Sequence, residues 1–115
     1  MKGAWVALSV IKSIKDSESL WCFAGSLDKN TVVELMPQGV GAFPVEGSRW
    51  TLDFQKLKYI DSAGLAFCLE CLRASKKNNI LLEILNAPDR LHALARAQGI
   101  EPLLIASIVA ERRQA

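Results

Sequence analysis

Two strand-like segments, each followed directly by a helical pattern, constrain the fold of this chain more than any other feature. Residues 49–55 alternate apolar and polar side chains, and residues 80–85 form a nearly continuous apolar run. The first pattern is typical of a strand with two distinct faces, and the second of a strand covered on both faces. Helical patterns follow at residues 62–77 and 89–98. This order predicts an α/β fold with a partly parallel sheet and right-handed crossovers.

The N-terminal part of the chain predicts two further strands. Residues 5–11 and 20–24 are rich in β-forming side chains, and the polar stretch 15–19 separates them. Short runs of this kind, divided by polar residues, are typical of a pair of neighbouring strands.

A short helix and a long loop are expected between these strands and residue 49. Asp28 and Asn30 can cap a helix that begins near Thr31, and Pro37 would end it. Residues 38–48 contain three glycines and a proline, which predicts the one long loop. The C-terminal residues 101–115 fit a helix and a strand equally well.

The size and charge of the chain limit what it can be. With 115 residues, of which 50% are apolar, it can bury one core, and two domains would each be too small. Its apolar runs fall far short of the roughly 20 residues that a membrane-spanning helix needs, and no signal-peptide cleavage pattern follows the N-terminus. Three cysteines, an odd count, favour a reducing cytoplasm, and a net charge of +2 predicts no nucleic-acid partner.

No motif of a known catalytic or metal site is present in the sequence. Cys68 and Cys71 form a C-x-x-C pair, but they lie two turns inside a predicted helix, so we interpret them as buried small apolar residues. His92 is the only histidine, which leaves too few ligands for zinc. Nucleophile-elbow and phosphate-binding glycine motifs are absent. No enzyme signature therefore remains, and we expect neither a cofactor nor a metal.

The turn before the longest predicted helix is the candidate functional site. Asp61 is a good N-cap, and Ser62 follows it at the end of the helix where free N–H groups favour a phosphate. Gly64 in the first turn sacrifices about 1 kcal/mol of helix propensity relative to alanine, which suggests that a second backbone approaches closely. The alternative is that this segment is only a well-formed helix start.

The same helix carries apolar side chains on two opposite faces. We expect one face to enter the core: Leu65, Cys68, Leu69 and Leu72. The opposite face is also apolar: Ala63, Ala66, Phe67 and Ala74. If this second face is exposed, Phe67 is the centre of a contact patch, with Glu70 at its border. The alternative is that another element covers it.

Three short motifs of the chain resemble the STAS domain. They are the turn Gly25-Ser26-Leu27-Asp28, the strand segment Leu52-Asp53-Phe54, and the sequence Ile60-Asp61-Ser62-Ala63-Gly64-Leu65. This domain is shared by anti-sigma-factor antagonists, sulfate-transporter tails and the MlaB subunit of a lipid ABC transporter. The resemblance covers roughly residues 5–104.

The resemblance implies an α/β fold with a mixed sheet of four or five strands and about four helices. It also implies a protein-binding role without catalysis. Residues 1–115 would be one STAS domain, with a core over about 5–104 and a tail over 105–115. The segment 86–95, followed by Gly99 and Ile100, is similar to the third helix of the MlaB branch.

In that branch the protein partner is the ATPase of an ABC-type phospholipid transporter. The domain would then be cytoplasmic, or peripheral at the inner membrane through its partner. The alternative is an anti-sigma-factor antagonist, in which a partner kinase phosphorylates Ser62. A homodimer remains open.

The expected partner-binding or phosphorylation site consists of eight residues in the turn and the helix after it: Asp61, Ser62, Ala63, Gly64, Leu65, Ala66, Phe67 and Glu70. Asp61 would cap and rigidify the helix, and Ser62 would hydrogen-bond the partner. Gly64 would permit close approach of the partner, and Phe67, if exposed, would anchor it.

Overall fold

The computed structural model describes residues 7–35, 44, 47 and 49–109, and every structural statement below refers to them. The five strands are β1 (Leu8–Lys15), β2 (Glu18–Leu27), β3 (Arg49–Ile60), β4 (Leu81–Leu85) and β5 (Ile108–Val109). The four helices are α1 (Val32–Leu35), α2 (Ser62–Lys77), α3 (Asp89–Ala97) and α4 (Glu101–Ile105).

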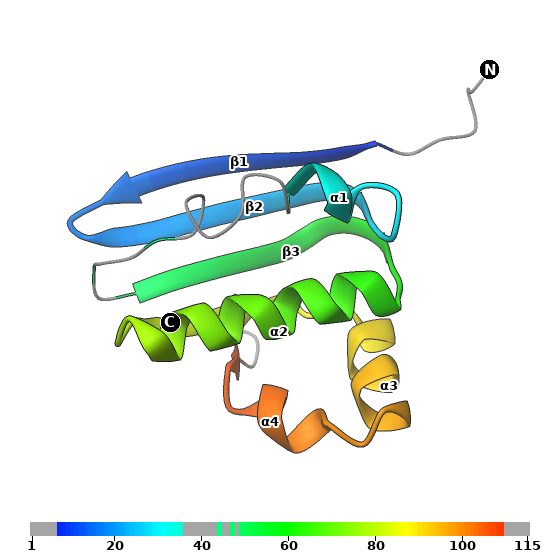
Figure 1. Cartoon of the computed structure of the whole chain (residues 1–115). Coiled ribbons are helices and arrows are strands. Elements are labelled where there is room, and N and C mark those ends of the chain that lie inside the picture. The colour runs from blue at the N-terminus through cyan, green and yellow to red at the C-terminus, as the bar shows by residue number, and fades with distance from the viewer. Residues whose placement is uncertain (1–6, 36–43, 45–46, 48, 110–115) are drawn as a thin grey trace.

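The five strands form one mixed sheet in the order β1-β2-β3-β4-β5. The hairpin β1–β2 is antiparallel, and the other three pairs are parallel. The long helix α2 packs along β3 and β4, with α3 and α4 beside it (Figure 1). The predicted α/β fold and mixed sheet are confirmed.

The core lies between the helices and one face of the sheet. Aromatic rings from neighbouring strands meet there edge to face: the Trp21 and Trp50 ring centroids are 5.1 Å apart, and those of Phe23 and Phe54 are 5.0 Å apart. Such arrangements stabilise a core beyond the area that they bury.

The opposite face of the sheet is open among the described residues. Ile11, Leu20 and Leu81 are exposed there, and Arg49 forms an ion pair with Glu83 at 3.5 Å. The expectation that β4 is covered on both faces is therefore wrong, because the helices cover only one face of the sheet.

Several predicted boundaries change in the structure. The polar stretch after β1 contains only a two-residue turn, because Asp16 and Ser17 both adopt positive φ, as tight hairpins require. β3 continues to Ile60, five residues past the predicted end. It does so because β2 pairs with it up to Leu27. The predicted long loop lies almost wholly outside the described residues. Residues 5 and 6, which begin the first predicted strand, and Pro37, the predicted end of the short helix, also lie outside them.

The C-terminal part of the chain contains both a helix and a strand. α3 ends at Ala97, and Gly99 adopts a φ of +72° just after it, the conformation expected at a helix C-terminus. α4 and the short strand β5 then follow, and β5 pairs with β4. The ambiguous tail therefore supplies the fifth strand of the sheet.

Candidate functional site

Asp61 connects the start of α2 to the turn after β2. Its Oδ1 atom accepts hydrogen bonds from the backbone N–H groups of Ala63 (2.9 Å) and Gly64 (3.2 Å), so it is the predicted N-cap. Its Oδ2 atom accepts from the backbone N–H of Lys29 at 3.1 Å. The backbone N–H of Asp61 donates to the carbonyl oxygen of Leu27 at 3.3 Å. One carboxylate thus fixes two turns that are 32 residues apart.

The turn after β2 has its own network of hydrogen bonds. Asp28 Oδ1 accepts from the backbone N–H groups of Asn30 (2.9 Å) and Thr31 (3.1 Å). The Thr31 hydroxyl donates to the carbonyl oxygen of Ser26 at 2.7 Å. Two of the three motifs of the STAS resemblance therefore meet in space, at the end of the sheet where β2 and β3 finish.

Ser62 lies at the surface of this arrangement. Its side chain is exposed, and the capping bonds of the helix come from Asp61. Ala66 is exposed one turn later, while Ala63 and Glu70 are half-buried. Glu70 forms an ion pair with Arg73 at 3.3 Å. The start of α2 thus presents small and polar side chains to solvent.

Gly64 is buried against the end of β2. A Cβ atom at this position would lie 2.5 Å from the carbonyl oxygen of Leu27 and 2.5 Å from Cγ1 of Ile60. The expected close approach of a second backbone is therefore present, but that backbone belongs to this chain. The interpretation that Gly64 admits a partner is corrected, because the residue faces inward.

Gly64→Ala should lower the free energy of unfolding by about 2 kcal/mol. The added methyl group meets a backbone oxygen that cannot move aside, and overpacking of this kind outweighs the gain in helix propensity. Urea denaturation would measure the change, with the exposed Ala66→Gly variant as a helix-propensity control. A more stable Gly64→Ala protein would show that the space beside Gly64 is open.

Phe67 is a core residue and not a surface anchor. Only 1% of its area is exposed, and its ring centroid lies 6.0 Å from that of Phe23 on β2. Leu65 is also buried. The contact patch centred on Phe67 is therefore corrected: the sheet covers that side of α2.

The helix presents a different stripe to solvent. Its buried side carries these residues: Gly64, Leu65, Phe67, Cys68, Cys71 and Ser75. Leu69 and Leu72, which the sequence pattern assigned to the core, are only half-buried. The outer stripe consists of Ser62, Ala66, Leu69 and Arg73, which recur at helical spacing.

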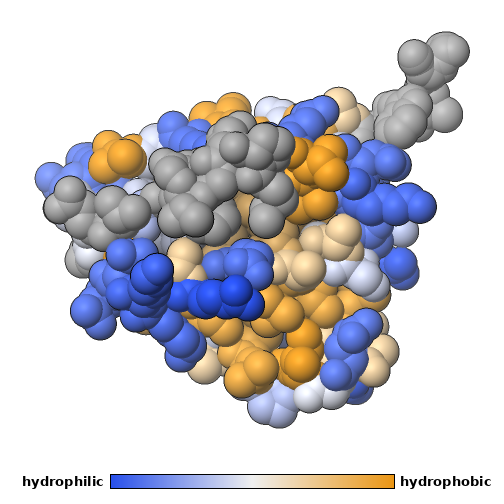
Figure 2. Space-filling model, in the orientation of Figure 1, coloured by the Kyte–Doolittle hydropathy of each residue, from blue (hydrophilic) through white to orange (hydrophobic). Residues whose placement is uncertain are grey.

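Two partly or fully exposed apolar residues near the site were not among the expected site residues. Leu69 lies half-buried on the outer stripe of α2, and Val33 on α1 is 54% exposed. Figure 2 shows that apolar surface gathers over α2 and α4 on this side of the molecule. No sequence signal marks Leu69 as a residue of the outer stripe, because the helix carries apolar side chains on both faces.

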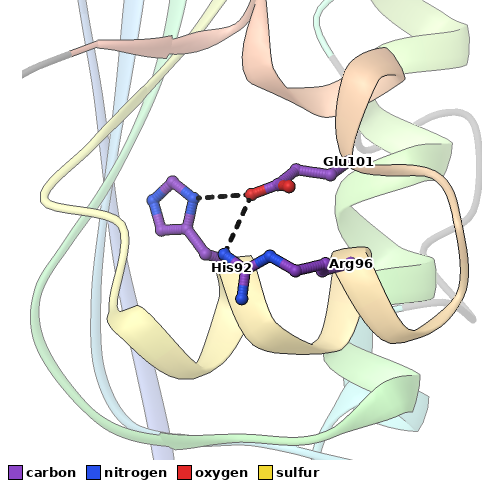
Figure 3. Close-up of polar contacts among 3 residues, drawn as sticks. All are labelled: His92, Arg96 and Glu101. Atoms are coloured by element: carbon purple, nitrogen blue, oxygen red, sulfur yellow. Dashed lines mark hydrogen bonds and ion pairs between the residues drawn. The ribbon is translucent and has the colours of Figure 1, made fainter.

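His92 belongs to a separate polar cluster that joins α3 to α4 (Figure 3). Glu101 Oε2 lies 3.7 Å from Nδ1 of His92 and 3.3 Å from Nη2 of Arg96. His92 is half-buried beside α4. These three side chains hold the two short helices together.

The thiols of Cys68 and Cys71 are buried inside α2. Burial raises the pKa of Cys68 to about 12. Burial, with smaller contributions from the charges of Cys68 and Glu70, also raises the pKa of Cys71. A redox pair needs the opposite shift, because the thiolate is the reactive form.

Stability should fall as pH rises above about 9. An unfolded thiol loses its proton near its ordinary pKa, whereas the folded one keeps it to about 12, so the unfolded state is favoured in between. Each thiol contributes about 1.4 kcal/mol per pH unit. Urea denaturation from pH 8 to 11 would measure the slope, which Cys68→Ala with Cys71→Ala should reduce.

The same thiols should react with a labelling reagent far more slowly than the half-exposed Cys22 in the folded protein. Fast labelling of either buried thiol, with a midpoint below neutral pH, would contradict the burial.

No group of three or more histidine, cysteine, aspartate or glutamate side chains among the described residues is placed to hold a metal ion. Within the same residues, every helix is too short or too polar to cross a membrane.

Solved structures with a similar fold include an anti-sigma factor antagonist and a sulfate transporter family protein. The anti-sigma factor antagonist SpoIIAA in its unphosphorylated form gives a TM-score of 0.69 at 16% identity, over 94% of this chain and 90% of that one. The Bacillus cell fate determinant SpoIIAA in the phosphorylated form gives a TM-score of 0.65 at 15% identity, over 94% of this chain and 93% of that one. A sulfate transporter family protein from Wolinella succinogenes gives a TM-score of 0.67 at 15% identity, over 87% of this chain and 82% of that one.

The sequence itself matches none of the curated proteins with which it was compared. Its residues 13–106 match the protein family described as "Mlab, STAS domain". This match spans both turns that Asp61 joins, and it covers most of the chain. The chain therefore belongs to the MlaB branch of the STAS-domain family.

Proposed function

We propose that this STAS domain is a non-catalytic accessory subunit that binds the ATPase of an ABC-type phospholipid transporter. The observation that carries the proposal is the exposed Ser62, held at a helix start that Asp61 fixes from two sides. STAS domains act as protein-interaction modules, and the matching family is the MlaB one.

The docking surface consists of the outer stripe of α2 and the turn before it. Asp61 makes this surface rigid, because its hydrogen bonds to Lys29 and to the first turn of α2 are already formed in the free domain. A surface that is ordered before binding loses less conformational entropy in the complex. Ser62 has the hydroxyl that can hydrogen-bond the ATPase.

The apolar part of the contact comes from residues other than Phe67. Ala66 is small and exposed, so a partner helix can approach the backbone of α2 there. Leu69 offers an apolar side chain one turn further along, and Val33 on α1 offers another. Arg73 and Glu70 border this surface with charge. An apolar centre with a polar rim is the usual anatomy of a protein interface.

Recovery of the native complex tests the proposal. The tagged chain, expressed in its own cell, should co-purify with an ABC ATPase and its membrane permease, identified by mass spectrometry. Recovery of a kinase and a sigma factor in their place would contradict the transporter function. If the ATPase and the permease are recovered, the permease, and not this chain, accounts for the association with the inner membrane.

The alternative function is that of an anti-sigma-factor antagonist. It is favoured by the exposed hydroxyl of Ser62 at the N-terminus of a 16-residue helix, where a kinase can reach it. A phosphate there gains from the free N–H groups of the helix, but it meets the negative charge of Asp61. Phosphopeptide mass spectrometry of the native protein distinguishes the two functions, because only the antagonist requires phosphorylated Ser62.

A further inference from the structure

The second half of β3 has a strand partner on only one side. β4 pairs with β3 from Arg49 to Asp53, whereas β2 accompanies β3 to Ile60. Residues 54–60 therefore border no other described strand on the β4 side. A strand edge of this kind offers N–H and C=O groups to an extended peptide.

Side chains close the two ends of this edge and leave its middle open. At one end, Asp53 Oδ1 accepts from the backbone N–H of Gln55 (3.0 Å) and from Nδ2 of Asn86 (3.0 Å). At the other end, Nε of Arg90 donates to the carbonyl oxygen of Ile60 at 2.6 Å. The open stretch is residues 56–59, which we call the β3 edge.

The β3 edge is surrounded by positive charge. Lys56 and Lys58 are exposed, and neither forms an ion pair with another described residue. Arg90 stacks on the Tyr59 ring, 5.1 Å from its centroid, and it also has no acidic partner in the described part of the chain. A depression of about 50 Å³ lies between β3 and the start of α3, lined by Leu57, Lys58, Tyr59, Ile60, Pro88 and Arg90.

We propose that the β3 edge binds an extended, acidic segment of a protein partner, which adds a strand to the sheet. The backbone of the segment pairs with the open stretch of β3, and its carboxylates pair with Lys56, Lys58 and Arg90. β3 leads directly into Asp61 and Ser62, so the segment lies beside the α2 docking surface. The inference deepens the proposed function and rests on it only for the identity of the partner.

The other free edge of the sheet is less suited to an acidic segment. β1 also carries two lysines, but the ammonium of Lys12 lies 4.0 Å above the ring of Trp21. Lys15 stands opposite Glu18 across the hairpin, so an acidic residue of this chain already faces it. Each lysine of β1 thus faces an aromatic or acidic residue of β2, whereas Lys56 faces Ala24 and Lys58 faces no residue of β2 in the register.

A fluorescent peptide that alternates glutamate and valine tests the inference on the full chain. We expect saturable binding below about 1 mM, weakened at least about tenfold by Lys56→Glu with Lys58→Glu, because like charges would then face each other. Lys76→Glu with Lys77→Glu, which makes the same change in charge at the other end of α2, should leave the affinity unchanged. Hydrogen exchange should slow at the amides of residues 56–60 when the peptide binds.

Four results would overturn the inference: no binding at 1 mM, equal binding of a lysine–valine peptide, equal weakening by the control pair, or slowed exchange only in β1. Should the glutamate pair destabilise the fold, Lys56→Gln with Lys58→Gln should still weaken binding. The peptide contains no part of an ATPase, so this result does not depend on whether the transporter function is correct.

Discussion

Replacing Phe67 with alanine is expected to lower the free energy of unfolding by about 3–5 kcal/mol, as full truncation of a core aromatic does. The ring is 1% exposed and packs edge to face on Phe23, so its loss leaves a cavity between α2 and the sheet. Urea denaturation monitored by circular dichroism would measure the loss. A variant that does not fold at all would agree with this expectation.

Leu69→Ala is the matched control on the same helix. Leu69 is half-buried on the outer stripe, so its truncation should lower the free energy of unfolding by only about 1 kcal/mol. A Phe67→Ala protein as stable as the Leu69→Ala protein would contradict the burial of Phe67. It would also restore Phe67 as a contact residue.

The ends of α2 could be predicted from the sequence, but its rotation could not. Asp61 as N-cap and the lysines of the last turn act locally, so short-range rules place both ends of the helix. The rotation of α2 about its axis depends on which of its two apolar faces packs against the sheet. One face carries three alanines and Phe67, and the other carries mainly leucines, so the sequence pattern alone does not decide. The position of Phe23 on β2, far away in the sequence, decides between them.

The length of β3 also depends on contacts that are distant in the sequence. Gln55, Lys56 and Lys58 look like the end of a strand, and local propensity stops at Gln55. In the structure, β2 pairs with Lys56, Leu57, Tyr59 and Ile60 and skips Gln55 and Lys58 at two register shifts, so β3 continues to Ile60. Irregular pairing of this kind leaves no alternation that a sequence pattern can detect.

Some of the residues that form the site could be predicted from the sequence. Asp61 and Ser62 follow from capping preferences and from the STAS resemblance. The bond from Lys29 to Asp61 could not be predicted, because it involves a backbone N–H that any residue would provide. The inward direction of Gly64 was equally hidden, since a glycine pattern indicates a close approach but not whose backbone approaches.

Ser62→Glu is expected to leave the isolated domain folded and to weaken its binding to the ATPase about a hundredfold. Ser62 is exposed, and a negative charge at a helix N-terminus is mildly favourable, so the melting temperature should hardly change. In the complex the carboxylate would be buried beside Asp61, where an unpaired charge costs several kcal/mol. A loss of about 3 kcal/mol corresponds to about a hundredfold in Kd.

Two control variants separate the site from a general effect of charge. Ser62→Ala should change the free energy of unfolding by only a few tenths of a kcal/mol, because Asp61 provides the cap. Ser13→Glu makes the same substitution at an exposed position on β1, and it should keep full affinity for the ATPase. Full affinity of Ser62→Glu with an intact fold would exclude this turn as the docking site. Equal weakening by Ser13→Glu would show that net charge, and not contact at Ser62, controls binding.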